Sequence, residues 1–177
     1  MILTGLEIVK QVKEQKIEIS PFDSKFITTN SYDLTLGNRF IRYKEKIIDP
    51  KKKTRYEEFE ANSSDGLLLM PGDFVLGHTQ EIIGSDYFVP IIHAKSGTAR
   101  TGLFVHVTAD LIDIGSHGCS TLQLFATLPV KIYPGTKIAQ VSFWVPKGEI
   151  VLYEGKYQGS LGPRPSMTYL DYKNGKE

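Results

Sequence analysis

Cysteine and long apolar runs are scarce in this 177-residue sequence. The one cysteine, Cys119, excludes an intrachain disulfide framework and is typical of a reducing compartment, where we expect it to be a small buried residue. No segment approaches the ~20 apolar residues that a membrane span needs, and the charged N-terminal residues lack the apolar run of a signal peptide. These absences predict a cytoplasmic protein without a membrane partner.

Net charge is nearly absent as well. The 21 Lys and Arg residues balance the 20 Asp and Glu residues to within +1, so the sequence lacks the overall field of a nucleic-acid or membrane-surface binder. The run Lys51–Lys53 permits a nucleic-acid role, but the polar stretch from Asp49 to Asp65 around it favours a solvated loop or hairpin. We therefore expect no nucleic-acid partner, and any anion site must be local.

The motifs of several common enzyme classes are also missing. One cysteine cannot supply the Pro-Cys-x-x-Cys pair of zinc nucleobase deaminases. Neither the phosphate loop of nucleoside triphosphatases nor the glycine pattern of dinucleotide-binding proteins occurs. The histidines lack the spacing of metal ligands and are interpreted as structural or surface residues: His78, His93, His106 and His117. No metal site built from side chains is expected.

The apolar pattern changes early in the chain from helical to strand-like. Thr4 and Glu7 have capping-box spacing, and the apolar residues after them predict one short helix that ends near Lys16. Beyond it, short β-rich runs separated by turn residues predict an all-β distorted jelly roll or β-barrel. The expected strands are 32–36, 40–43, 74–78, 102–107, 120–127, 130–133 and 137–145. The length and the 41% hydrophobic content suit one domain over residues 1–177.

The C-terminal stretch from Gly155 to Glu177 differs in composition from the rest. It is rich in Gly, Pro and Ser and too polar for a core strand. Such composition is typical of a mobile surface segment. We expect residues 155–177 to form a mobile lid.

Polar clusters lie at the ends of the expected strands, where a rigid β scaffold positions a functional site. The cluster Lys95–Arg100 combines two cations, two hydroxyls and a glycine, which a triphosphate requires, although an ordinary polar loop has the same composition. Asp113 follows the apolar Ile112 and precedes a glycine-containing turn. Its carboxylate could orient a water molecule as a general base or cap the turn.

Taken in order, these clusters resemble the dCTP deaminase and dUTPase superfamily, in its deaminase branch, from Met1 to about Ser166. The matching motifs are Ser31–Gly37, Pro71–Gly77, Lys95–Arg100 with Gly97 in place of a serine, His106–Gly115, Tyr133–Ile138 and Gly155–Gly159. The resemblance implies a dUTPase-like jelly roll that forms a homotrimer with active sites shared between subunits. It also implies magnesium bound through the triphosphate and a C-terminal lid over the bound nucleotide.

The resemblance assigns roles to individual residues. Asp113 matches the water-orienting aspartate of dUTPases, and Gln123 stands where deaminases carry the glutamate that activates water. Asp110 stands where dUTPases have glycine, and Ser160 stands where deaminases usually have glutamine. Nucleotide contacts are assigned to Lys95, Ser96, Arg100, Thr108, Ala109, Gln140, Tyr153, Lys156, Tyr157 and Ser160.

The departure at Gln123 decides between reactions. An amide cannot accept a proton from water, and the loss of a general base typically removes ~10²–10⁴-fold of the rate. Hydrolysis between the α and β phosphates needs a carboxylate, magnesium and cations, and does not require the missing glutamate. The sequence therefore predicts a dUTP diphosphatase that forms dUMP and pyrophosphate. The alternatives are dCTP deamination, alone or combined with hydrolysis, and a non-catalytic nucleotide-binding homologue.

Overall fold

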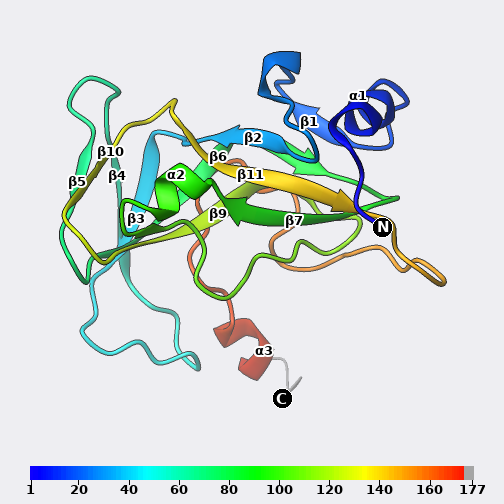
Figure 1. Cartoon of the computed structure of the whole chain (residues 1–177). Helices are drawn as coiled ribbons and strands as arrows, with labels where there is room; N and C mark the ends of the chain where they lie inside the picture. Colours follow the sequence, from blue (N-terminus) through cyan, green and yellow to red (C-terminus); the bar gives the residue numbers. More distant parts are fainter. Residues whose placement is uncertain (174–177) are drawn as a thin grey trace.

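The computed structural model describes residues 1–173, and its framework is built from strands (Figure 1). Residues 174–177, the end of the expected lid, lie outside the described residues. The helical elements are α1 (Gly5–Lys13), the 3-10 turn η1 (Ser24–Phe26), α2 (Ser96–Ala99) and α3 (Tyr169–Lys173). The strands are β1 (Glu18–Ser20), β2 (Tyr32–Thr35), β3 (Arg39–Tyr43), β4 (Tyr56–Glu60), β5 (Leu67–Leu69), β6 (Phe74–Gly84), β7 (Val89–Ala94), β8 (Leu103–Phe104), β9 (His117–Ala126), β10 (Val130–Ile132) and β11 (Lys137–Trp144).

Three antiparallel sheets make up the molecule. The largest has the order β4-β3-β6-β9-β8, with β1 also paired to β6; a second has the order β2-β11-β7, and β10 pairs with β5. Neighbouring strands are often distant in the sequence, as a jelly roll requires. The prediction of an all-β, dUTPase-like fold is confirmed.

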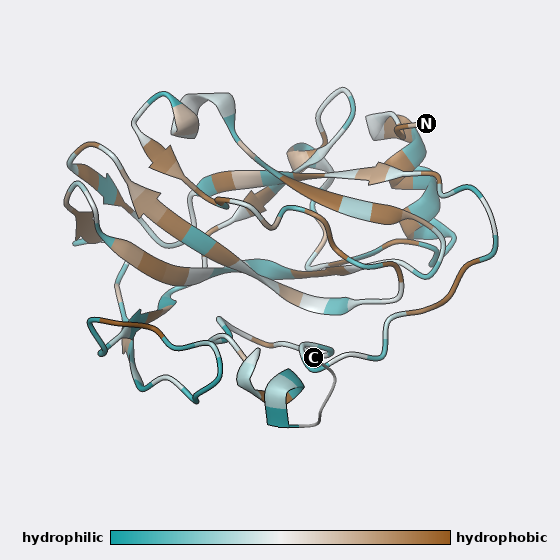
Figure 2. Ribbon diagram, turned by 90° about the horizontal axis from the view of Figure 1, so that it is seen from below, coloured by the Kyte–Doolittle hydropathy of each residue, from teal (hydrophilic) through white to brown (hydrophobic). Residues whose placement is uncertain are grey.

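The hydrophobic core lies on the inner faces of the two larger sheets, and Figure 2 shows hydrophobic residues concentrated along the strands. On β9 the side chains of Leu122, Leu124 and Ala126 are buried in this core. Because side chains alternate across a strand, Thr121 and Gln123 lie on the opposite face of β9. The alternation that builds the core therefore leaves a polar face of the same strand free for a site.

Several expected boundaries were wrong. The first helix ends at Lys13 rather than near Lys16, because Gln15 takes a left-handed φ of 58° that cannot continue a helix. The expected strand 102–107 is only the two residues of β8, and β7 was not expected because Pro90 lacks the N–H that an interior strand supplies. Neither β1 nor β5 was expected.

The polar stretch from Asp49 to Asp65 contains an ordered strand. β4 lies within it and pairs with β3 from Arg39↔Glu60 to Tyr43↔Tyr56. The hairpin interpretation of this stretch is therefore the correct one. Among residues 1–173 no helix is long and apolar enough to cross a membrane.

Candidate active site

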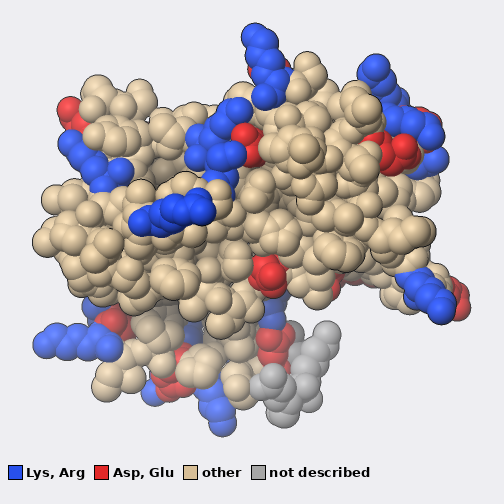
Figure 3. Space-filling view, viewed as in Figure 1, with Lys and Arg blue, Asp and Glu red and all other residues tan. Residues whose placement is uncertain are grey.

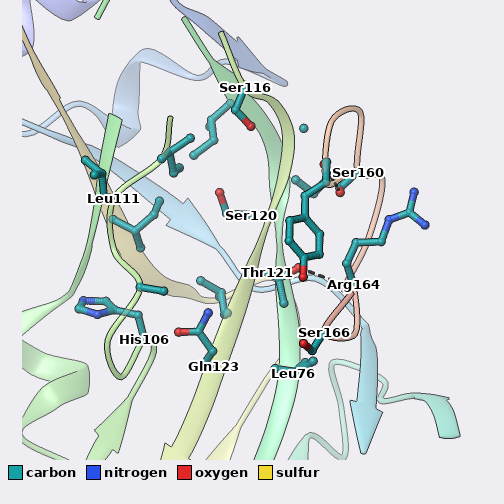
Figure 4. Close-up of a pocket in the computed structure, with 18 of the residues that line it drawn as sticks. Leu76, His106, Leu111, Ser116, Ser120, Thr121, Gln123, Ser160, Arg164 and Ser166 are labelled. Atoms are coloured by element: carbon teal, nitrogen blue, oxygen red, sulfur yellow. Dashed lines mark hydrogen bonds between the residues drawn. The ribbon is translucent and has the colours of Figure 1, made fainter. Parts of the chain in front are cut away.

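A cavity of about 460 Å³ lies on the polar face of β9. Its polar lining comes mainly from β9 with Gln123, the turn before β9 with Ala109 and Asp113, and the C-terminal tail with Tyr157 and Ser160, and strands β3, β6 and β7 also contribute residues. Figure 4 shows His106 and Gln123 on one side of the cavity and Ser160, Arg164 and Ser166 of the tail on the other. The volume lies within the ~300–1,000 Å³ of small-molecule sites.

Gln123 is held at the cavity wall by the turn that precedes β9. Its Oε1 accepts a hydrogen bond from the backbone N–H of Val107 at 3.4 Å. The next residue toward the N-terminus, His106, also lines the cavity, and its Nδ1 is buried with no hydrogen-bond partner among the described residues. Since an amide oxygen is neutral, Gln123 can position the turn or a water molecule but cannot take a proton.

Asp113 lies in the tight turn that leads into β9. The backbone carbonyl of Asp113 accepts the N–H of Ser116 at 3.0 Å, and Gly115 takes a left-handed φ of 85°. The turn is thus closed by the backbone of Asp113, and no hydrogen bond to its exposed carboxylate occurs within residues 1–173. The carboxylate of Asp113 therefore does not cap the turn, and its water-orienting role stays a prediction.

Asp110 lies beside β7, on the other side of the same turn. Its backbone carbonyl accepts the N–H of Ile92 at 2.9 Å. Burial lowers the pKa of the nearby His93, and the negative charge of Asp110 only partly offsets this. The Nε2 of His93 lies 2.7 Å from the hydroxyl of Ser142. Asp110 therefore lies beside a histidine that burial keeps neutral, at β7, and does not line the cavity.

The C-terminal tail docks on the start of β9. Gly118 and Ser160 form a parallel bridge, in which the N–H of Cys119 donates to the carbonyl of Ser160 at 2.7 Å. Ser160 is buried, and a Cβ on Gly118 would lie 2.7 Å from its backbone nitrogen. Cys119 itself is buried, as expected. In the structure the lid is thus in place over the cavity; that it is mobile without nucleotide stays a prediction.

Hydroxyl groups hold the rest of the tail. Tyr43 Oη accepts the backbone N–H of Ser166 at 2.9 Å, and Thr121 Oγ1 accepts that of Arg164 at 3.0 Å. Burial raises the pKa of Tyr43, so its hydroxyl stays neutral. Sequence reasoning missed both Tyr43 and Thr121, because each contacts the tail from a separate strand and no local motif marks them.

The expected site residues separate into two groups. Those that line the cavity are Ala109, Asp113, Gln123, Tyr153, Tyr157 and Ser160. Those that do not are Lys95, Ser96, Arg100, Thr108, Gln140 and Lys156. Lys95 and Gln140 do not line the cavity because they belong to another sheet. Lys95 follows β7 and Gln140 lies on β11, both in the three-stranded sheet, whereas Gln123 lies in the six-stranded sheet.

Three of the six residues in the second group have side-chain partners within the chain. Lys95 and Lys137 both contact the buried carboxylate of Asp33, with Lys137 Nζ at 3.2 Å. Gln140 accepts from Ser31 at 2.8 Å, and Lys156 pairs with Asp171 of α3. The three remaining residues are exposed: Ser96 on α2, Arg100 just after it, and Thr108 in the turn before β9.

The surface carries its charge in both signs. Figure 3 shows Lys and Arg scattered over one face, with Asp and Glu among them, rather than gathered in one patch. The described residues contain no group of three or more His, Cys, Asp or Glu side chains that could hold a metal ion.

The comparisons with known proteins agree with this architecture. A family model described as dCTP deaminase-like matches residues 2–145. The "dCTP deaminase, dUMP-forming" of Clostridium botulinum (strain Eklund 17B / Type B) is 43% identical over 174 residues, covering 98% of this chain and 99% of that protein. The protein of the same name from Leptospira biflexa serovar Patoc (strain Patoc 1 / Ames) is 38% identical over 174 residues, with 98% and 99% covered.

A solved structure gives the same picture of the fold. The 2'-deoxycytidine 5'-triphosphate deaminase from Agrobacterium tumefaciens matches with a TM-score of 0.64 and 22% identity, over 82% of this chain and 48% of that one. The chain thus spans about half the length of that solved chain. Fold and site define a nucleotide enzyme of the all-β, dUTPase-like class. Within that class, the chain belongs to the dCTP deaminase-like family.

Proposed function

We propose that this protein is an enzyme that converts a pyrimidine deoxynucleoside triphosphate to dUMP. The observation that carries the proposal is the single cavity at which the turn 106–115, the polar face of β9 and the tail meet. The names of the relatives support dUMP as the product. To form dUMP from dCTP, an enzyme must remove both ammonia and pyrophosphate, so two chemical steps have to be considered separately.

The step that removes pyrophosphate is the one that the residues of this chain support. It requires a carboxylate that orients water toward the triphosphate, and Asp113 offers an exposed carboxylate on the cavity wall. When bound to the triphosphate, magnesium would neutralise part of its charge. We therefore infer that cleavage of dUTP to dUMP and pyrophosphate is the principal reaction.

The step that removes ammonia is the second candidate function. The relatives named dCTP deaminase, 43% and 38% identical over nearly the whole chain, favour it. Against it stands Gln123, because attack of water on cytosine C4 needs a group that takes a proton from water and returns one to the ring and the leaving ammonia. An amide cannot do either.

Among the described residues that line the cavity, Arg164 is the one Lys or Arg, so further cations for the three phosphate groups have to come from elsewhere. Ser96 and Arg100 are exposed and do not line the cavity of their own chain. We infer that the loop Lys95–Arg100 of a neighbouring subunit completes the site in a homotrimer. Lys156 would join them once nucleotide phosphate displaces Asp171 from it.

One experiment distinguishes the three candidate functions, which are dUTP cleavage, dCTP deamination and nucleotide binding without catalysis. The protein is incubated with magnesium and either dUTP or dCTP, and dUMP, dUTP, dCMP and released ammonia are quantified. We expect dUMP from dUTP and no ammonia from dCTP. Ammonia release from dCTP at a rate comparable to dUTP cleavage would establish the deaminase instead. Nucleotide binding without any product would establish the non-catalytic homologue.

A further inference from the structure

A three-residue charge cluster surrounds His117, which is the first residue of β9 and itself lines the cavity. The Nδ1 of His117 is 2.6 Å from a carboxylate oxygen of Glu18, and its Nε2 is 3.0 Å from a carboxylate oxygen of Asp86. A neutral imidazole carries one N–H and can donate to only one of them. Both hydrogen bonds form only when the ring is the doubly protonated imidazolium.

The sheet places these three side chains together. Glu18 on β1 lies opposite Gly84 on β6, and Gly84 lies opposite His117 on β9. Glu18, Gly84 and His117 therefore form one row across the sheet. A Cβ on Gly84 would lie 2.5 Å from Nδ1 of His117, and the glycine therefore leaves the space in which Glu18 reaches the ring. Asp86 approaches from the segment after β6.

The backbone of His117 is also the docking point of the tail. Its N–H donates to Oε1 of Gln158 at 2.8 Å, and its carbonyl accepts the N–H of Gly159 at 2.9 Å. The amide nitrogen of Gln158 donates in turn to the carbonyl of Gly115 at 2.7 Å. The residue after Gly159 is Ser160, which lines the cavity. The charge cluster and the cavity are thus joined through His117.

We propose that His117 is a positioning residue: clamped as an imidazolium between Glu18 and Asp86, it holds the start of β9 in the conformation that docks the tail, and so keeps Tyr157 and Ser160 at the cavity. The link to turnover rests on the proposed function, because it takes the cavity to be the nucleotide site. The docking of the tail itself can be measured without nucleotide.

The direction of the pH effect follows from the neighbours of the ring. Burial is the largest influence and lowers the pKa of His117, but the hydrogen bonds and charges of Asp86 and Glu18 together outweigh it, so the pKa is raised. Among the described neighbours, β6 contributes only Gly84, and the tail contributes Gln158 and Gly159, which do not titrate. The clamp is therefore complete below about pH 6.5, the ordinary pKa of histidine, and is lost as the pH rises through the raised pKa of the folded protein.

Hydrogen exchange of the full-length protein tests the proposal directly. The protection factor of the Gly159 amide, corrected for intrinsic exchange, is measured by NMR from about pH 6 to pH 9, which brackets a raised histidine pKa. We expect it to decrease about fivefold across this range, as befits the loss of two partly exposed ion pairs. In His117→Gln it should be low and independent of pH.

A matched control keeps the test specific. Glu18→Gln removes a carboxylate of the clamp whose side chain is 43% exposed, and Glu7→Gln removes a helical carboxylate that is 40% exposed and pairs with Lys10. We expect Glu18→Gln to lower the protection factor of the Gly159 amide. Glu7→Gln should leave the pH dependence of that protection factor as in wild type. The proposal would be overturned if the protection factor of the Gly159 amide did not change with pH in wild type and had the same value in His117→Gln.

Two further measurements exclude simpler explanations. If His117→Gln loses protection at Leu124 in the core of β9, it has unfolded, and Glu18→Gln and Asp86→Asn then carry the test. With dUTP as substrate, His117→Gln should raise KM about fivefold with little change in kcat, from the same two ion pairs. A wild-type protein that does not cleave dUTP would refute the proposed function, whereas the exchange result would still decide the role of His117.

Discussion

At the scale of single residues, two side chains on one cavity wall divide the chemistry. Gln123 is half-buried and bonded to the backbone of Val107, whereas Asp113 has an exposed carboxylate. The amide of Gln123 can hold a water molecule, whereas the carboxylate of Asp113 can also orient and polarise one. The proposed function assigns Gln123 to the base end and Asp113 to the phosphate end of the nucleotide, so the two residues can be tested independently.

The base end is tested by Gln123→Glu. We expect wild-type protein to release no measurable ammonia from dCTP, and the variant to release it, because a carboxylate restores the proton acceptor that the amide lacks. The gain should approach the ~10²–10⁴-fold of a general base. Cleavage of dUTP serves as the internal control and should not change. Equal ammonia release by both proteins would mean that another residue is the base.

The phosphate end is tested by Asp113→Asn. We expect kcat for dUTP to decrease by ~10²–10⁴-fold with little change in KM, since the carboxylate acts on water rather than on substrate. Because the backbone of Asp113, and not its side chain, closes the turn, the free energy of unfolding should remain within ~0.5 kcal/mol of wild type. If Asp113→Asn unfolds instead, the carboxylate of Asp113 caps the turn, and the water-orienting role is wrong.

At the scale of elements, β9 performs two tasks with its two faces. Leu122, Leu124 and Ala126 belong to the core, while Thr121 and Gln123 face the cavity. The start of the strand binds the tail, through Gly118 and Cys119. The core and the polar part of the cavity wall are therefore formed by alternate residues of one strand.

A pair of substitutions on β9 should separate these tasks. Leu124→Ala removes a fully buried side chain and should lower the free energy of unfolding by ~2–5 kcal/mol. Thr121→Ala removes only the acceptor for the Arg164 N–H and should cost ~0.5–1.5 kcal/mol, but it should raise KM for dUTP. Urea unfolding and steady-state kinetics provide the measurements. Similar costs in stability for both variants would contradict the assignment of the two faces.

At the scale of the whole molecule, the cavity of one chain has a single Lys or Arg on its wall among residues 1–173, Arg164. Lys95 is bound to Asp33, and Arg100 is exposed away from the cavity of its own chain. An isolated chain would leave a triphosphate largely uncompensated, because no other phosphate-binding loop occurs in the sequence. This is the physical reason to expect a homotrimer with sites between subunits.

Subunit mixing tests the shared site. We expect light scattering to give three times the 19.9 kDa of the chain. Arg100→Ala and Asp113→Asn proteins should each be inactive, but when they are refolded together about one quarter of the sites, each formed between two neighbouring subunits, should regain both residues and activity. Wild-type chains refolded with either variant serve as the control. A stable monomer with full activity would refute the trimer, and a mixture without recovered activity would refute the shared site.

Much of the fold and part of the site could be predicted from the sequence, because both depend on local patterns. The alternation around Leu122 and Leu124 predicts a strand with one buried face, and the turn residues near Gly115 predict its start. The motifs themselves place Asp113 and Gln123 at a site. Where the local pattern is weak, as in β7 with Pro90, the prediction was wrong.

The sequence alone determined the class of fold, the family and part of the cavity lining, including Asp113 and Gln123, since each is written within a few consecutive residues. Only the tertiary structure decided which distant groups meet there. His117 and Glu18 are 99 residues apart, and Tyr43 and Ser166 are 123 apart. Such pairs are brought together by the order and register of the strands, and no local periodicity encodes which strand lies beside which.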